Sequence, residues 1–233
     1  MKKLILTFLI ILFTLTSNVV WSADYNKGQD AFYSEDYTSA LRIWTPLAEQ
    51  GDLYSQYALG YLYDFGLGTL QNDKTAVKWY TLAAEQGSAL AQANLGDMYY
   101  HGEGVSKDDK TAVKWYTLAA EQGNPKSQNN LGQHYRNGDG VIQDYKTSIK
   151  WYTLAAEQGH AISQVNLSDM YERGYGVLKD NIYAHMWGNI SSFNGREEGA
   201  EIRDRVSKNM TSDDISKAQN LARECVAKNY IDC

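Results

Sequence analysis

Hydrophobic and polar positions follow a helical period along most of the chain. In residues 88–123, apolar side chains recur every three or four positions over two stretches, which predicts two amphipathic helices. Gly102 and Gly104 separate the stretches, and Gly123 stands where the second one stops, a common place for glycine at a helix end. The second helix is expected to bury a stripe made of Ala112, Trp115, Tyr116, Ala119 and Ala120.

This pattern returns every 36 residues. Residues 73–87 and 109–123 are identical, and the string Ala-Glu-Gln-Gly ends at Gly51, Gly87, Gly123 and Gly159. The same interval separates four tryptophans that we assign to the core, Trp79, Trp115, Trp151 and Trp187. One helix pair cannot bury its own apolar face, but stacked pairs can. We therefore predict an all-α fold, a right-handed superhelical solenoid of antiparallel helix pairs with a concave surface.

Glycine recurs inside the first predicted helix of three units, at Gly60, Gly96 and Gly132. A glycine in a helix interior costs about 1 kcal/mol relative to alanine. Its recurrence therefore indicates that the neighbouring helix comes too close for a side chain. Ser168 takes this position in the last unit, which we interpret as a looser terminal repeat.

The first 23 residues are typical of a secretory signal peptide. Lys2 and Lys3 precede an apolar stretch over residues 4–15, which is shorter than the roughly 20 residues that span a bilayer. Small and polar residues follow, and we expect cleavage after Ser22 or Ala23. This predicts a periplasmic or secreted protein with no membrane span after cleavage. An uncleaved membrane anchor is the alternative.

Composition favours a folded, acidic protein. The chain is 43% hydrophobic and 12% aromatic, enough for a sizeable core. It has 22 basic and 28 acidic side chains, a net charge of −6. Binding to a phosphate backbone needs clustered positive charge, so we expect no nucleic-acid partner.

Two sequence patterns resemble the Sel1-like repeat, a relative of the tetratricopeptide repeat, in its bacterial secreted or periplasmic type. One is Ala-Gln-x-Asn-Leu-Gly-x-Met-Tyr-x-x-Gly-x-Gly-Val at residues 91–105, and the other is Lys-Thr-Ala-Val-Lys-Trp-Tyr-x-x-Ala-Ala-Glu-Gln-Gly. The resemblance implies four repeats over residues 52–87, 88–123, 124–159 and 160–195. An N-terminal tetratricopeptide-like helix pair would occupy residues 24–51, where Pro46 departs from the pattern and is expected to kink the second helix.

The last segment, residues 196–233, is interpreted as a helical cap on the solenoid. Two amphipathic helices are predicted, over residues 196–210 and 212–228. Cys225 and Cys233 would be about 12 Å apart on one continuous helix, too far for a disulfide, so they can pair only if the helix ends between them. Cysteines at this spacing join neighbouring helix pairs in cysteine-rich relatives, so the resemblance implies a Cys225–Cys233 disulfide. Two free thiols are the alternative.

The sequence lacks the common catalytic and metal-binding motifs. The four histidines lack metal-ligand spacing, and the Gly-x-Gly pairs lie between helices with no preceding strand, so we assign them to turns. Some cysteine-rich relatives have been associated with β-lactam binding or hydrolysis, but neither Ser-x-x-Lys nor Lys-Thr-Gly occurs here. We predict no catalytic residue, no cofactor and no metal, and hence no enzyme.

The resemblance places a peptide-binding groove along the first helices. In the tetratricopeptide fold, an asparagine before the Leu-Gly pair can hold the backbone of an extended peptide, since an amide both donates and accepts. The matching residues here are Asn94, Asn130 and Asn166. Further candidates lie one and two turns along: Tyr61, Asp97, Gln133 and Asp169, then Asp64, Tyr100, Arg136 and Glu172. The alternative is that the asparagines only pack the helices together.

The predicted function is that of an exported, non-enzymatic adaptor or scaffold that binds a protein or peptide on the concave face. Two alternatives stay open. One is a β-lactam-binding or β-lactamase-like protein, and the other is a purely structural spacer in the cell envelope. The sequence does not specify the partner or the oligomeric state.

Overall fold

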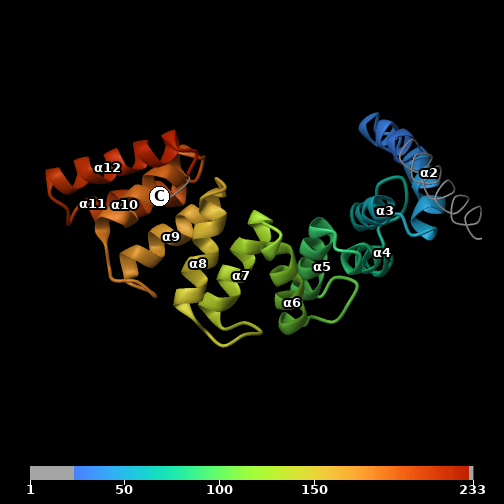
Figure 1. The fold of residues 1–233 in the computed structure, drawn as a ribbon, viewed down its shortest axis with the longest axis horizontal. Coiled ribbons are helices and arrows are strands. Elements are labelled where there is room, and N and C mark those ends of the chain that lie inside the picture. The colour runs from blue at the N-terminus through green and yellow to red at the C-terminus, as the bar shows by residue number, and fades with distance from the viewer. Residues whose placement is uncertain (1–23, 231–232) are drawn as a thin grey trace, which may run out of the picture. The chain divides into compact units, whose positions relative to one another are not determined.

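The computed structural model describes residues 24–230 and 233, and these form helices joined by short loops, with no strand among them (Figure 1). The predicted signal peptide lies outside the described residues. The chain divides into a first unit that ends at Lys107 and a second that begins at Asp108. The all-α helical-repeat architecture expected from the sequence is thus confirmed.

The first unit contains two and a half helix pairs. Residues 24–33 are helical and precede α2, and each helix after that packs on the one before it in sequence. The labelled helices are α2 (Tyr37–Glu49), α3 (Leu53–Phe65), α4 (Asp73–Glu85) and α5 (Ala89–His101).

The second unit continues in the same way, and then α11 and α12 both pack against α10. Its helices are α6 (Asp109–Glu121), α7 (Pro125–Asn137), α8 (Tyr145–Ala156), α9 (Ala161–Arg173), α10 (Asn181–Phe193), α11 (Glu197–Ser207) and α12 (Ser212–Ala227).

Capping residues place the helix boundaries. In α7, the Asn124 side chain accepts from the Ser127 amide, Pro125 occupies the first turn, and Gly138 ends the helix in the left-handed conformation. The other first helices of the repeats begin and end alike, with N-caps at Asp52, Ser88 and His160 and left-handed glycines at Gly66, Gly102 and Gly174.

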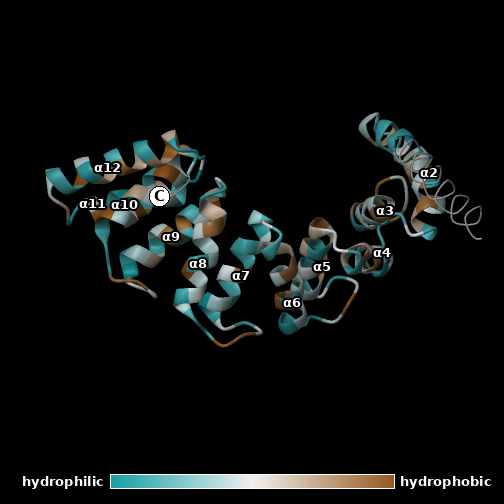
Figure 2. Ribbon diagram, in the orientation of Figure 1, coloured by the Kyte–Doolittle hydropathy of each residue, from teal (hydrophilic) through white to brown (hydrophobic). Residues whose placement is uncertain are grey.

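Each unit has its own core. Trp44, Leu59 and Leu62 are buried in the first unit, and Tyr152 and Met170 in the second. Among the four tryptophans predicted to be core, three are buried, while Trp151 is half-buried. Figure 2 shows that the helices mix hydrophobic and hydrophilic residues. Accordingly, no helix among the described residues is long and apolar enough to cross a membrane.

The glycines inside the first helices mark close helix contacts, as expected. A Cβ built on Gly60 would lie 2.5 Å from the Tyr80 ring, and one on Gly132 would lie 2.7 Å from the Tyr152 ring. Both distances are far shorter than any van der Waals contact. The tyrosine ring therefore fills the space that the glycine leaves, and both tyrosines are almost fully buried.

In the last repeat, the glycine lies on the second helix and the larger residue on the first. Our interpretation of Ser168 as a sign of loose packing is therefore wrong. The position equivalent to Tyr80 and Tyr152 is Gly188, and a Cβ there would lie 3.1 Å from the Ser168 hydroxyl oxygen. Ser168 is fully buried and donates to the Ala184 carbonyl at 2.6 Å. Gly188 thus lies on the second helix, where the absence of a side chain allows α11 to pack closely.

The second glycine of each Gly-x-Gly pair has a packing role beyond the turn that the sequence predicted. Gly140 has φ 72°, and a Cβ on it would lie 2.5 Å from the carbonyl carbon and oxygen of Asp109, at the start of the preceding pair's second helix. Gly68, Gly104 and Gly176 approach the equivalent backbone at 2.5–2.6 Å. Each loop therefore rests on the previous helix pair.

Pro46 lies inside α2, which continues to Glu49. The kink expected at this proline stays a prediction.

The cap residues form the two predicted helices, α11 and α12. Thr211 and Asp214 make a capping box at the start of α12. The helix ends at Ala227, and Asn229 and Tyr230 adopt positive φ angles of 52° and 69°, which turns the chain back.

This turn allows the disulfide between Cys225 and Cys233, which is present as the resemblance implied. Cys225 is buried in the core of the second unit. The Tyr230 hydroxyl donates to the Asn194 side chain at 3.1 Å, so the tail is also held against the end of α10.

Gly140→Ala is expected to destabilise the protein at least twice as much as Gly123→Ala. Both glycines have positive φ, which costs a residue with a side chain about 1–2 kcal/mol. Only at Gly140 would the new Cβ also meet backbone, since nothing lies within 4 Å of a Cβ on Gly123. Urea unfolding followed by circular dichroism measures both; equal losses would contradict the loop-contact role.

Cys233→Ser is expected to lower the free energy of unfolding by about 2–3 kcal/mol, because the eight-residue loop no longer restricts the unfolded chain. Reducing the wild-type protein with dithiothreitol serves as the control and should produce the same loss. The reductant should leave the variant unchanged. A wild-type unfolding midpoint that does not respond to reductant would argue against a stabilising disulfide.

Candidate functional site

The candidate groove residues lie on the first helices of the repeats and remain accessible. Tyr61 and Asp64 belong to α3, and Asn94, Asp97 and Tyr100 to α5, all in the first unit. The second unit holds the rest. Gln133 is exposed, and the other candidates are half-buried: Asn130, Arg136, Asn166, Asp169 and Glu172.

The asparagines also bond within the protein. The Asn94 side chain lies near the phenols of Tyr57 and Tyr80, whose pKa burial raises, and acts to lower the pKa of both. In the second unit, the Asn166 amide donates to Asn129 Oδ1 at 3.1 Å. These contacts match the packing role that we considered as the alternative. Both residues are half-buried, so part of each also remains accessible to a peptide.

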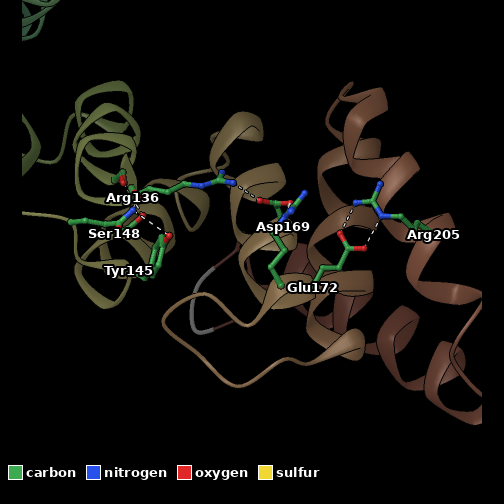
Figure 3. Close-up of polar contacts among 9 residues, drawn as sticks. Arg136, Tyr145, Ser148, Asp169, Glu172 and Arg205 are labelled. Atoms are coloured by element: carbon green, nitrogen blue, oxygen red, sulfur yellow. Dashed lines mark hydrogen bonds and ion pairs between the residues drawn. The ribbon is translucent and has the colours of Figure 1, made fainter. Parts of the chain in front are cut away.

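Ion pairs join the first helices of neighbouring pairs in the second unit (Figure 3). Arg136 of α7 reaches Asp169 of α9 at 2.6 Å, and Arg173 reaches the other oxygen of the same carboxylate at 2.5 Å. Arg205 of α11 binds Glu172 through two nitrogens, at 2.6 and 2.5 Å. The two carboxylate side chains are only 14% and 16% exposed. Each is neutralised by a cation of the same unit.

The equivalent repeat positions carry different charges in the first unit. Asp64 and Asp97 are spaced along the sequence as Arg136 and Asp169 are, but both are acidic. Asp64 accepts a hydrogen bond from the Tyr80 hydroxyl at 3.2 Å. Burial raises the pKa of the Asp64 carboxyl, and the negative charges of Glu103, Asp73 and Asp97 raise it further.

An aromatic pocket of about 240 Å³ is lined in part by Tyr61, which precedes Asp64 by three residues on α3. The helical segment 24–33, α2 and α3 line it with Gln29, Phe32, Tyr33, Trp44, Tyr57, Ala58 and Tyr61. The rings of Phe32 and Tyr61 are 6.0 Å apart, and Tyr33 is 78% exposed. Of these residues, sequence reasoning identified only Tyr61 as a candidate. The available indication was the unusual run of aromatic residues in α3.

A second pocket, of about 520 Å³, is lined by residues of α10, α11 and α12. Its lining is largely apolar and includes Ile190, Phe193 and Val226, with Arg203 and Arg223 as its cations. Sequence reasoning did not identify it. Phe193 is 77% exposed.

The described residues contain no group of histidine, cysteine, aspartate and glutamate side chains placed to hold a metal ion. His185 is buried with its Nδ1 atom unpaired; burial, followed by the charge of Arg203, lowers its pKa. This imidazole therefore stays neutral at physiological pH, as expected of a packing residue.

Comparisons with known proteins agree with the geometry. The Sel1 repeat family matches residues 53–88, 89–124, 125–160 and 161–190. The crystal structure of c5321, a protective antigen present in uropathogenic Escherichia coli strains, is 36% identical with a TM-score of 0.75, and covers 82% of this chain. The chain spans only 42% of that antigen's length. A Sel1 repeat protein from Oxalobacter formigenes is 33% identical with a TM-score of 0.74, covering 87% of this chain and 84% of its own. The comparison with curated proteins finds no match.

Asp64→Asn is expected to stabilise the protein at pH 7. A carboxyl whose pKa is raised on folding contributes stability below its unfolded pKa of about 3.9, and loses it as pH rises through the folded value. The asparagine side chain does not ionise, so the variant does not lose this stability as pH rises. We expect the melting temperature to rise by about 1–3 °C at pH 7, a small effect because solvent screens a half-exposed group.

The difference between Asp64→Asn and wild type should shrink towards pH 4. Asp204→Asn is the matched control, because the pKa of Asp204 is lowered by its hydrogen bond with Arg203. That variant should not gain stability at pH 7. A destabilised Asp64→Asn at neutral pH would show that the carboxylate is structurally favourable.

Proposed function

Because the chain belongs to the Sel1 repeat family, we propose that it is an exported, non-enzymatic adaptor or scaffold that binds a protein or peptide along the first helices of its repeats. Proteins of this family are generally protein-interaction scaffolds and typically non-catalytic. We infer that this chain binds its partner on the concave face of the solenoid.

The observation that carries the proposal is the row of half-exposed polar side chains that recurs on the first helices. Asn94, Asn130 and Asn166 follow one another at the 36-residue interval, and each residue is half-buried. An amide can bond to both the carbonyl and the N–H of an extended chain, whatever its sequence. The neighbouring positions differ from repeat to repeat, which supplies selectivity for side chains.

Two features support export. Residues 4–15 form the apolar centre of a secretory signal pattern. The Cys225–Cys233 disulfide is of a kind that persists in oxidising compartments such as the periplasm or the cell exterior.

The experiment first identifies the partner by photo-crosslinking in living cells. A crosslinking amino acid placed at Gln133, exposed on α7, should trap the partner for mass spectrometry. The same amino acid at Leu118, exposed on the second helix α6, is the matched control. Adducts at the control position alone would favour the structural-spacer alternative.

Asn94→Ala combined with Asn130→Ala is then expected to weaken binding of the purified partner at least tenfold, about 1.4 kcal/mol. Since Asn94 also lies near two tyrosines, unfolding is measured in parallel to show that the variant is folded. Asn209→Ala, in the exposed loop after α11, should leave the affinity unchanged. A folded double variant with wild-type affinity would refute the asparagine assignment.

A further inference from the structure

We propose that the aromatic pocket of the first unit, together with Asp64 one helical turn beyond its Tyr61, binds a lysine or arginine side chain of the partner protein. This inference rests on the proposed function and specifies the partner's chemistry at the first unit. The pocket has room for one long side chain and carries no charged lining residue.

Its walls are suited to a cation. Phe32, Tyr33 and Tyr61 present aromatic rings, and Tyr33 is largely exposed. A ring face attracts an ammonium or guanidinium group by about 0.5–1 kcal/mol at an exposed site and more where water is excluded. The chain already uses this contact elsewhere, with Lys107 lying 4.9 Å from the centre of the Tyr100 ring.

The negative charge of Asp64 is carried one helical turn from Tyr61. Asp64 follows Tyr61 by three residues on α3, so the two share one face of the helix. Tyr57 lines the pocket; its phenol pKa is raised by burial, then by Tyr61, with a smaller contribution from the charge of Asp64. A cation seated over the rings would therefore also be attracted by the carboxylate.

The second unit shows how carboxylates at the equivalent repeat positions are neutralised when the protein supplies the cation. Asp169 and Glu172 each bind arginine of the same unit. Glu103, Asp73 and Asp97 all act on Asp64, and all three are acidic. Residues 24–107 carry eleven acidic and five basic side chains, against seventeen and fifteen from residue 108 onward. The first unit is the one whose charge complements a basic segment.

The environment of Asp64 agrees with a binding role. Its carboxylate is partly desolvated among like charges, an arrangement that costs folding stability at neutral pH. A cation of the partner would neutralise the Asp64 carboxylate, and binding would thereby offset that loss of stability. For Asp64→Asn, weaker binding of the cation combined with a higher stability would therefore distinguish a binding role of this carboxylate from a structural one.

The test titrates three peptides into the ¹⁵N-labelled protein, as recovered from cells that express the full chain. They are Gly-Ser-Gly-Arg-Gly-Ser-Gly and the same peptide with glutamate or leucine in place of arginine. The arginine peptide should shift the amide signals around Tyr57 and Tyr61 with a millimolar Kd that weakens at least threefold in 0.5 M NaCl. The glutamate peptide should bind at least tenfold more weakly.

Asp64→Asn should weaken the arginine peptide at least fivefold while melting no lower than wild type. Tyr61→Ala should also weaken it, and Asp204→Asn, the exposed carboxylate of the second unit, should not. A leucine peptide that binds as well as the arginine peptide, or an arginine peptide that does not bind, would overturn the assignment.

Failure here is distinguishable from failure of the adaptor function. If the crosslinked partner still binds and still depends on Asn94 and Asn130, the adaptor role stands and only the cation pocket is wrong. If the partner's binding is also insensitive to the asparagines, the adaptor site itself is wrong.

Discussion

The contact between a glycine in the first helix of a pair and a tyrosine ring in the second is the interaction on which the helix pairs depend. Gly60 with Tyr80 and Gly132 with Tyr152 leave no room for even a methyl group. A glycine within a helix costs about 1 kcal/mol, whereas burying a large aromatic side chain contributes about 1.5–3 kcal/mol. The exchange is favourable, and it brings the two helices closer than larger residues would allow.

A second glycine sets the spacing from one pair to the next. Gly140 packs against the start of α6, so each loop is positioned by contact with the helix pair before it. With both distances set by backbone and buried rings, the accessible positions of the first helices are free to vary in charge. The same register accordingly holds an arginine–aspartate pair in the second unit and two aspartates in the first.

The candidate site was partly predictable for this reason. The repeat register indicates which residues share a face, so the accessible positions on α3, α5, α7 and α9 could be named in advance. Their partners could not, because they come from other elements. Arg205 lies on α11, outside the repeat pattern, and the aromatic pocket depends on how the helical segment 24–33 packs near α3.

By itself, the sequence determined the helices, their caps, the 36-residue period and the family, because these follow from local patterns repeated along the chain. Tertiary structure decided the exchange of small residues between Ser168 and Gly188, the closing of the Cys225–Cys233 disulfide and the aromatic pocket. The physical reason is that each of these depends on the distance between elements, and packing sets that distance where the repeat pattern ends.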